Sequence, residues 1–428
     1  MALGLGNGDA RAFLRRALDP PTDTALEHAA AALHRVGALK GGAAPPPVGE
    51  SAPQALTAPI RARVDAWTNA KKVKDYKKAD AIRDELRKAA IDAPLREELT
   101  PLGSHLARMP LEPRVGKILI YGALLGCIDP ALTIAAAMSL SRSPFLTPHE
   151  RRQEAATARA DFVRDRSDHL ALLRAYEAWE LEYDVVGSHA ARRFAEAHFL
   201  SPNGMEELHG LRRTLGAQLA DIGFARSSAQ AAERAEANES ATQPTTQPAS
   251  ESPNLVRALV CAGLYPNLVR VRMPDTKYVA TAQGAIEAAN DDARAIRFYT
   301  LPNSRVFLHP SCALFTETAF NARWLVYTSK QQVAAEKVYV RDVSAVSPLA
   351  LLLFGGEVQV SHSSGTVTID GQISFEAPGR VAVLVRELRA ELDKLLAEKL
   401  ADPSLEIGTH PVVKAIVNLI NTERAGFS

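Results

Sequence analysis

The sequence of 428 residues has few cysteines and no long apolar run. Cys127, Cys261 and Cys312 lie far apart without a Cys-x-x-Cys pair, which argues against a disulfide scaffold or a thiolate zinc site and favours a reducing compartment. The longest apolar run, 118–128, is far shorter than the about 20 residues that span a bilayer. Residues 1–19 also lack the basic and apolar regions of a signal peptide. We therefore expect a soluble intracellular protein, in the cytoplasm or the nucleus.

The sequence has almost no net charge, because 50 Lys and Arg residues face 49 Asp and Glu residues. A global field that would attract nucleic acid is therefore excluded, and any site for a polyanion must be local. Residues 57–92 are locally basic, with ten Lys or Arg against six Asp or Glu. This run is either a solvated helix face or a surface that contacts RNA phosphates, through Lys74, Lys77 and Lys78.

Motifs that carry catalysis are missing as well. The sequence contains no Gly-x-x-x-x-Gly-Lys-Ser/Thr phosphate loop and no Gly-x-Ser-x-Gly elbow. His149-Glu150 lacks the second histidine of a zinc helix. The triplet Ser167-Asp168-His169 contains the residue types of a catalytic triad, but adjacent helical residues point in different directions, so it indicates a helix start. We expect no catalytic residues, no metal and no cofactor bound by this chain.

The length favours about three domains of unlike composition. Residues 226–252 contain no Val, Ile, Leu, Met or aromatic residue and are predicted to be a disordered linker in their second half, while the Ala-rich first half could extend the preceding helix. Residues 41–53 are rich in Pro and Gly and indicate a connector. Residues 99–223 show capped, Pro-punctuated amphipathic segments that predict a helical bundle.

Strands are expected after the linker, because nine of the 25 aromatic residues lie within 294–354. Five short runs alternate or are β-branched: 305–308, 324–327, 338–341, 358–360 and 367–369. With a helix over 254–263 before them and a helix over 381–400 after them, they predict a small antiparallel barrel. Asp370-Gly371 predicts a hairpin.

An ordered series of short motifs then supports a resemblance. The motifs are Leu99-Thr100-Pro101-Leu102-Gly103, Met109-Pro110-Leu111-Glu112-Pro113, Gly116-Lys117, Cys127-Ile128-Asp129-Pro130, Ser143-Pro144-Phe145 and Ser167-Asp168-His169-Leu170. This series resembles the helicase-associated region of DEAH-box RNA helicases. The segment ending Val36-Gly37-Ala38-Leu39 resembles the family's winged helix, and Gly263-Leu264-Tyr265-Pro266-Asn267 with His309-Pro310-Ser311 resembles its oligonucleotide-binding (OB) barrel.

The resemblance implies a multidomain α+β chain. Its predicted parts are a partial winged helix (1–40), a connector with a basic helical insert (41–98), a ratchet-like helical bundle (99–225), a disordered linker (226–253) and an OB-type antiparallel barrel with C-terminal helices (254–428). Within the insert, residues 74–86 are similar to a helical signature of the C-terminal region of cysteinyl-tRNA synthetases, which implies an added RNA-handling or docking hairpin without synthetase chemistry.

The resemblance also implies a function: a C-terminal accessory module of an ATP-dependent RNA helicase that guides single-stranded or structured RNA. The sequence shows no Walker A motif and no Asp-Glu-Ala-His box, so ATP and Mg would enter only through motor domains present in cis or in trans, and we expect no ATPase turnover from this chain alone. Because Met1 falls where the family is already inside the winged helix, we expect a fragment. The alternatives are a stand-alone protein that binds RNA or a partner, and a poorly folding pseudo-module.

Candidate RNA contacts come from the barrel and the insert. Nucleobases stack on aromatic rings, and Lys or Arg side chains beside them bind the phosphates. The predicted contacts are Arg323, Lys330, Lys337, Arg341, His309 and Trp324 in the barrel and Lys74, Lys77 and Lys78 in the insert. Trp324 could instead belong to the barrel core, and His309 could serve only a structural hydrogen bond. Arg142, Arg164 and His169 are weaker candidates in the bundle.

Overall fold

The computed structural model describes the chain in two compact units, 1–103 and 104–428. The described residues are 14, 17, 19–40, 98–109, 111–224, 252–274, 277–281, 284–288, 292–301, 303–334, 337–361, 365–376, 379–405, 407–408 and 410–423. Lys74, Lys77, Lys78 and the rest of the predicted insert lie outside them, and so do residues 226–251 of the predicted linker.

The first unit contains one described helix and a pair of short strands. Helix α3 (Asp23–Val36) begins where the Thr22 hydroxyl accepts a hydrogen bond from the Ala25 amide, and it ends at Gly37, whose φ of 85° favours glycine. Strand β1 (Leu39–Lys40) pairs in antiparallel fashion with β2 (Glu98–Leu99). Lys40 and Glu98, which flank residues 41–97 in the sequence, therefore lie side by side. The winged-helix assignment of this unit stays a prediction.

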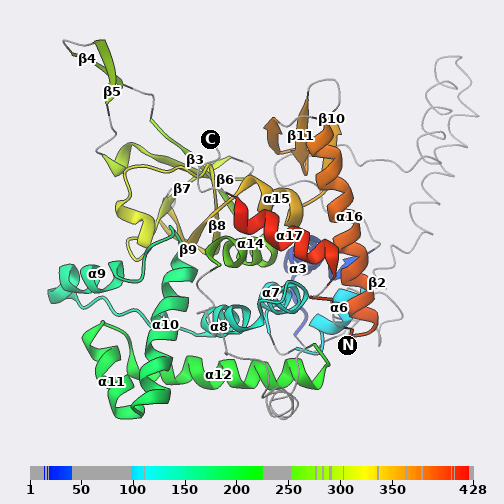
Figure 1. Cartoon of the computed structure of the whole chain (residues 1–428), viewed down its shortest axis with the longest axis horizontal. Coiled ribbons are helices and arrows are strands. Elements are labelled where there is room, and N and C mark those ends of the chain that lie inside the picture. The colour runs from blue at the N-terminus through cyan, green and yellow to red at the C-terminus, as the bar shows by residue number, and fades with distance from the viewer. Residues whose placement is uncertain are drawn as a thin grey trace, which may run out of the picture. The chain divides into compact units, whose positions relative to one another are not determined.

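The second unit starts with the helical bundle, and α6 (Pro101–Leu106) leads into it. Its elements are α7 (Pro113–Leu124), α8 (Ile128–Ser139), η1 (His149–Arg151), α9 (Arg152–Ala160), α10 (Asp168–Val185), α11 (Ser188–Ala197) and α12 (Pro202–Asp221). Helix α8 packs against α7, α10 and α12, and its Ala-rich sequence permits close approach. Trp179 and Tyr176 of α10 are almost fully buried in this bundle, which confirms the predicted helical region (Figure 1).

The barrel follows helix α14 (Pro253–Leu264) and is closed by five strands. They are β3 (Leu268–Arg272), β6 (Arg297–Thr300), β7 (Ser304–Leu308), β8 (Trp324–Ala334) and β9 (Lys337–Val346). The strand order β3-β6-β7-β9-β8 is that of an OB-fold. The prediction of an antiparallel barrel is wrong for one strand pair, because β7 and β9 pair in parallel. Parallel strands need a long crossover, and β8 occupies that crossover.

A separate sheet follows the barrel. The runs 358–360 and 367–369, which the pattern grouped with the barrel, form β10 (Val358–Ser361) and β11 (Thr366–Ile369) of a three-stranded sheet with β12 (Ile373–Glu376). Grouping them with the barrel was wrong, since alternation predicts strands and cannot tell which sheet they join. The Asp370-Gly371 hairpin is confirmed, and both residues have positive φ.

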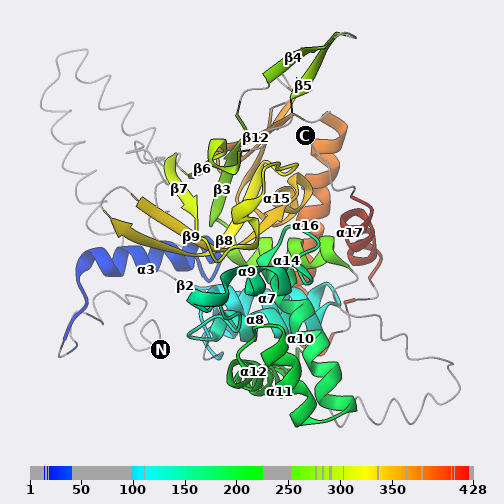
Figure 2. The same ribbon diagram turned by 90° about the vertical axis from the view of Figure 1, so that its left-hand side faces the viewer.

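Helices and a further hairpin complete this unit. Helices α15 (Pro348–Phe354), α16 (Gly379–Ala401) and α17 (Pro411–Thr422) pack beside the sheet and α14, and α16 confirms the predicted C-terminal helix. The hairpin β4 (Lys277–Thr281) with β5 (Gly284–Ala288) and the 3-10 turns η3 (Ala293–Ala295) and η4 (Ala313–Thr316) belong to the barrel's connections. Figure 2 shows β8 and β9 as the longest strands. None of the described helices is long and apolar enough to cross a membrane.

Candidate nucleic-acid interface

Three neighbouring barrel strands present aromatic and basic side chains on their outer face. Successive residues of a strand point to opposite sides, so Val306 and Leu308 of β7 enter the core while Arg305 and Phe307 face outward. The same alternation places Tyr299 of β6 and Tyr339 of β9 outside. The register joins them, because Tyr299 pairs with Arg305 and Phe307 with Tyr339. We call Tyr299, Arg305, Phe307, His309, Tyr339 and Arg341 the outer face.

The rings of the outer face lie against one another and against arginines. The Phe307 and Tyr339 rings have centroids 5.9 Å apart, and the Arg305 guanidinium lies 5.1 Å from the Phe307 ring. The rings of Tyr299, Phe307 and Tyr339 are all half-buried, so part of the surface of each ring is open to a ligand. Rings beside guanidinium groups can stack bases and bind phosphates at once.

His309 links the outer face to the next loop. Its Nε2 lies 2.8 Å from a guanidinium nitrogen of Arg341, and its Nδ1 lies 2.7 Å from the Ser311 hydroxyl. A guanidinium only donates, so Nε2 faces a donor from Arg341, and the Ser311 amide donates to Nδ1 at 3.1 Å. Burial and the charge of Arg341 both lower the pKa of His309. The neutral ring holds Arg341 in place at the end of the outer face.

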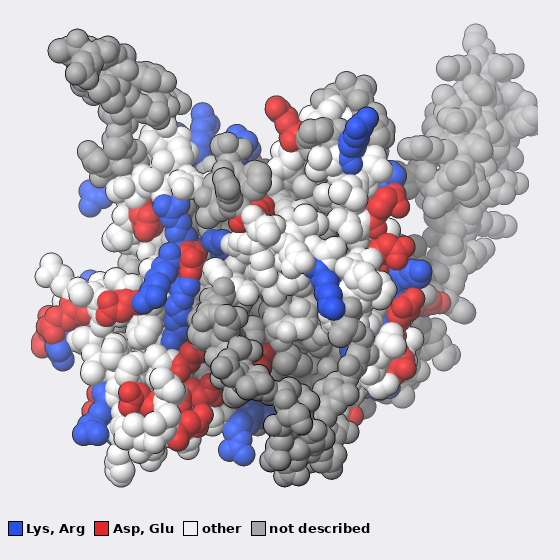
Figure 3. Space-filling model, in the orientation of Figure 1, with Lys and Arg blue, Asp and Glu red and all other residues white. Residues whose placement is uncertain are grey.

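A cavity of about 410 Å³ lies beside Arg341, between the bundle and the barrel. Arg142 and Ser143 line it from the loop after α8, and Ser329, Arg341 and Asp342 line it from the β8–β9 hairpin. Leu172, Leu173 and Ile134 supply apolar lining. Figure 3 shows Lys and Arg side chains gathered in a strip over β9 and the start of α10. The cavity itself is lined by both signs of charge, Arg142 and Arg341 with Asp168 and Asp342.

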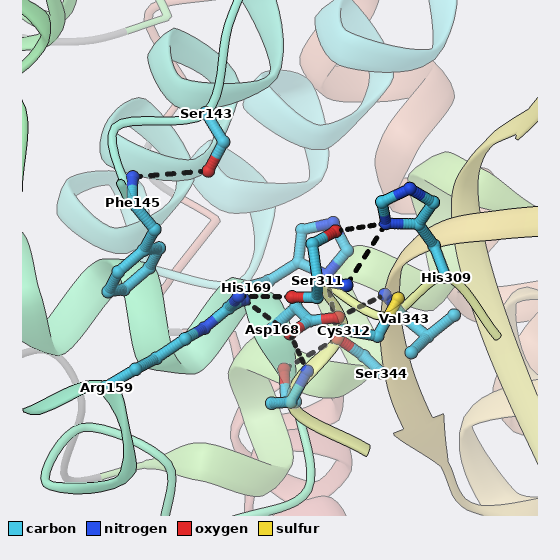
Figure 4. Close-up of polar contacts among 12 residues, drawn as sticks. Ser143, Phe145, Arg159, Asp168, His169, His309, Ser311, Cys312, Val343 and Ser344 are labelled. Carbon is cyan, nitrogen blue, oxygen red and sulfur yellow. Dashed lines mark hydrogen bonds and ion pairs between the residues drawn. The ribbon is translucent and has the colours of Figure 1, made fainter. Parts of the chain in front are cut away.

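A buried carboxylate joins the two sides of this cavity. One oxygen of Asp168 accepts hydrogen bonds from the Ala313 amide at 2.7 Å and the Arg159 guanidinium at 2.8 Å. The other oxygen accepts from the Val343 amide of β9 at 2.9 Å. Burial raises the pKa of Asp168, and Arg159 and the two amides oppose that shift. Figure 4 shows these groups converging on the carboxylate. Asp168 thus ties the first turn of α10 to the barrel.

The residues on either side of Asp168 contribute to the same junction. The Ser167 hydroxyl caps α10 by accepting from the Leu170 amide, as predicted for a helix start, and it lies 2.6 Å from the Ser344 hydroxyl. His169 places Nδ1 2.7 Å from Ser344 and Nε2 3.0 Å from Thr328. Burial lowers the pKa of His169 to about 4, so the ring is neutral at pH 7. The triplet is therefore a structural clamp between bundle and barrel.

The predicted contact residues fall into two places. Lys330 and Lys337 are exposed on the β8–β9 hairpin near Arg341, with Lys330 paired to Val340 in the register. Arg323 precedes β8 at its other end, roughly 23 Å from Lys330 at about 3.3 Å per strand residue. Lys330 is therefore close to Arg341 and His309, Lys337 lies nearer the turn of the hairpin, and Arg323 is apart from them.

Two candidates are buried. Trp324 is 7% exposed and His169 is 5% exposed. Trp324 is nevertheless not part of the barrel-core cluster and lines a hollow beside Arg323, whereas His169 has a structural role. Arg142 and Arg164 are exposed, and of these two Arg142 lines the cavity.

Sequence reasoning missed Tyr299, Arg305, Phe307 and Tyr339. A signal for two of them was present, because Arg305-Val306-Phe307-Leu308 alternates a core residue with an outward one. The cross-strand pairing that brings Tyr339 to Phe307 has no local signature, because it joins strands that are parallel and separated by β8.

Comparisons with known proteins agree with this fold. Residues 112–172 match the model of the ratchet-like helicase associated domain, residues 256–358 that of the oligonucleotide/oligosaccharide-binding fold, and residues 365–422 that of the C-terminal domain in RNA helicases. The chain is homologous to the C-terminal region of DEAH-box RNA helicases. Strands β11 and β12 and helices α16 and α17 lie in the third matched segment.

Individual relatives show how much of a helicase the chain corresponds to. Human DHX57, named as an ATP-dependent RNA helicase, is 38% identical over 342 residues, which are 76% of this chain and 24% of that protein. Human DHX36, an ATP-dependent DNA/RNA helicase, is 34% identical over 343 residues, 77% of this chain and 31% of its own length. The chloroplastic helicase DExH4 of Arabidopsis thaliana is 30% identical over 439 residues, 98% of this chain and 26% of its own length. The chain thus spans about a quarter to a third of the length of these relatives.

Proposed function

We propose that this chain is a C-terminal accessory RNA-binding module of a DEAH-box ATP-dependent RNA helicase, guiding single-stranded RNA. The observation that supports this most is the outer face, where rings and guanidinium groups alternate across β6, β7 and β9 and lead to the cavity lined by Arg142 and Arg341. The second and third strands of an OB-fold are the ones that bind oligonucleotides in such barrels.

The proposed mechanism is sequence-tolerant binding. Bases stack on Tyr299, Phe307 and Tyr339, each worth about 1–3 kcal/mol. Arg305 and the hairpin lysines Lys330 and Lys337 bind the phosphates, and Asp168 keeps the bundle and the barrel in register so that the path stays continuous. ATP and Mg act only through motor domains, in cis or in trans, so this module holds the strand while the motor moves it.

A charge-reversal experiment tests this function. Lys330→Glu/Lys337→Glu should bind a fluorescein-labelled 20-nucleotide oligouridylate about 10-fold or more weakly than the natural chain. The dependence of log affinity on log salt should become shallower by about 1.4, because two phosphate contacts on a single strand are lost. Fluorescence anisotropy over a salt series measures both quantities.

The matched control is Arg193→Glu/Arg213→Glu, which reverses two exposed arginines of α11 and α12 in the bundle. It should keep the natural affinity. An equal loss in both double variants would show a general charge effect and would contradict the proposal, as would unchanged affinity in the hairpin variant.

A stand-alone RNA- or partner-binding protein is the second candidate function. It makes the same use of the outer face and differs in needing no motor. The two are separated by adding helicase motor domains in trans, since an accessory module should raise their RNA-dependent ATP hydrolysis and a stand-alone binder should not.

A further inference from the structure

A basic hollow lies on the barrel beside the outer face, on strand β3, which pairs with β6. It encloses about 440 Å³ between β3, the start of β8 and strand β12 of the C-terminal sheet. Its polar and aromatic lining consists of Arg270, Arg272, Arg323, Trp324, Gln372, Ser374 and Phe375. We call it the arginine groove.

The fold brings the three arginines together. Arg270 and Arg272 are two residues apart on β3 and therefore point to the same side, while Val271 between them is buried. The Val271 amide donates to the Arg323 carbonyl at 2.8 Å, which fixes Arg323 beside β3. The groove thus takes its cations from two chain segments about 50 residues apart, a separation that follows from the barrel topology.

Among the residues that the structure describes, these positive charges have no acidic partner. None of the described acidic side chains lines the groove, and none pairs with Arg272 or Arg323. Arg270 donates to the neutral Asn303 amide oxygen at 3.0 Å and lies 5.9 Å from the Tyr299 ring. Arg297 faces Arg272 directly across the strand pair and adds a further exposed cation. Like charges placed opposite one another are unfavourable, and a bound anion relieves that repulsion.

The other lining groups select among anions. Guanidinium forks bind phosphate oxygens bidentately. The half-buried ring of Phe375 lies in the same groove, where a base can stack on it, and Ser374 is exposed beside it. A carboxylate-rich peptide could pair with the arginines but has no planar group to stack on the Phe375 ring.

We propose that the arginine groove is a second binding site for single-stranded nucleic acid, which holds the phosphodiester backbone through Arg272 and Arg323. It adjoins the outer face through Arg270 and Tyr299, yet its own phosphate ligands are different residues. The proposal does not rest on the function assigned to the outer face, because either surface can bind without the other.

The test is the double variant Arg272→Ala/Arg323→Ala, with the 20-nucleotide fluorescein-labelled oligouridylate as probe. We expect about 10-fold or greater loss of affinity and a salt dependence shallower by about 1.4. Arg193→Ala/Arg213→Ala removes the same charge from the exposed bundle surface and should bind as the natural chain does. Arg272→Lys/Arg323→Lys should keep the salt dependence and still lose affinity, because lysine keeps the charge without the fork. Unchanged affinity and salt dependence in the alanine variant would overturn the proposal.

Two further measurements distinguish this site from the outer face and from a protein site. Combined with Lys330→Glu/Lys337→Glu, the alanine variant should lose affinity by the product of the separate factors, and its own loss should persist even if the hairpin variant binds normally. A decapeptide of alternating Asp and Glu is the competitor. If it displaces the probe from the natural chain at lower concentration than unlabelled oligouridylate does, the groove is an acidic-peptide site and the proposal is wrong.

Discussion

At the scale of single residues, the junction between bundle and barrel depends on buried polar groups that satisfy one another. Asp168 is 4% exposed and accepts three hydrogen bonds, from Arg159, Ala313 and Val343. A buried charge is tolerated when it is paired and hydrogen-bonded in this way, and removing one partner leaves the other unpaired at a cost of about 3–5 kcal/mol. These hydrogen bonds therefore favour the one arrangement of α10 and β9 in which all of them can form.

His169 makes this junction sensitive to acid. The unfolded chain binds a proton at His169 below about pH 6.5, whereas the folded chain, with a pKa of about 4, does not until much lower pH. Between pH 6.5 and pH 4 the unfolded chain therefore binds more protons than the folded chain. The free energy of unfolding decreases as the pH falls through this range.

The variant His169→Gln tests this prediction, because glutamine keeps a donor and an acceptor and does not titrate. From pH 7 to pH 4 the free energy of unfolding of the natural chain should fall relative to that of the variant by up to about 3 kcal/mol. Urea denaturation at a series of pH values measures the difference. Parallel curves would show that His169 does not carry the acid sensitivity.

At the scale of elements, the outer face follows from the pleat of three strands. Val340 of β9 is fully buried while Tyr339 beside it is half-buried, so one strand supplies both core and surface. The barrel core fixes which side each residue takes, because a slip of one residue would bury Arg341 and expose Val340. The ring positions are therefore as well determined as the core itself.

Tyr339 offers a direct test of base stacking. Tyr339→Ala should weaken binding of the labelled oligouridylate by roughly 5- to 160-fold, since one stacked base is worth about 1–3 kcal/mol. Tyr339→Phe keeps the ring and should bind nearly as the natural chain does. Anisotropy titrations of both variants, after their melting curves are shown to match, measure this. Equal losses in the two variants would point to the hydroxyl and away from stacking.

The local sequence pattern predicted where helices and strands form better than it predicted which strands pair. The sequence predicted the cap at Ser167, the C-terminal helix after the sheet and the alternation of residues 305–308, because each depends only on residues that are close in the chain. The parallel pairing of β7 with β9 and the separate β10–β12 sheet were not, because they depend on which distant strand is available. For the same reason Lys330 and Arg341 could be predicted as surface cations, but their separation from Arg323 could not.

At the scale of the whole molecule, residues 104–428 form one compact unit in which bundle, barrel and C-terminal sheet share interfaces. The near-zero net charge of the chain conceals two places where basic residues gather, the outer face with its hairpin and the arginine groove. Both lie on the barrel, and each is built from strands that the fold alone brings together. This distribution is what a module that holds a strand along a surface requires.

The central claim, that the outer face binds single-stranded RNA, is tested most directly by hydrogen–deuterium exchange of the full chain with and without the 20-nucleotide oligouridylate. Peptides covering residues 297–312 and 324–346 should exchange more slowly when the RNA is bound. Protection confined to peptides of the bundle helices α11 and α12, with residues 297–346 unchanged, would contradict it.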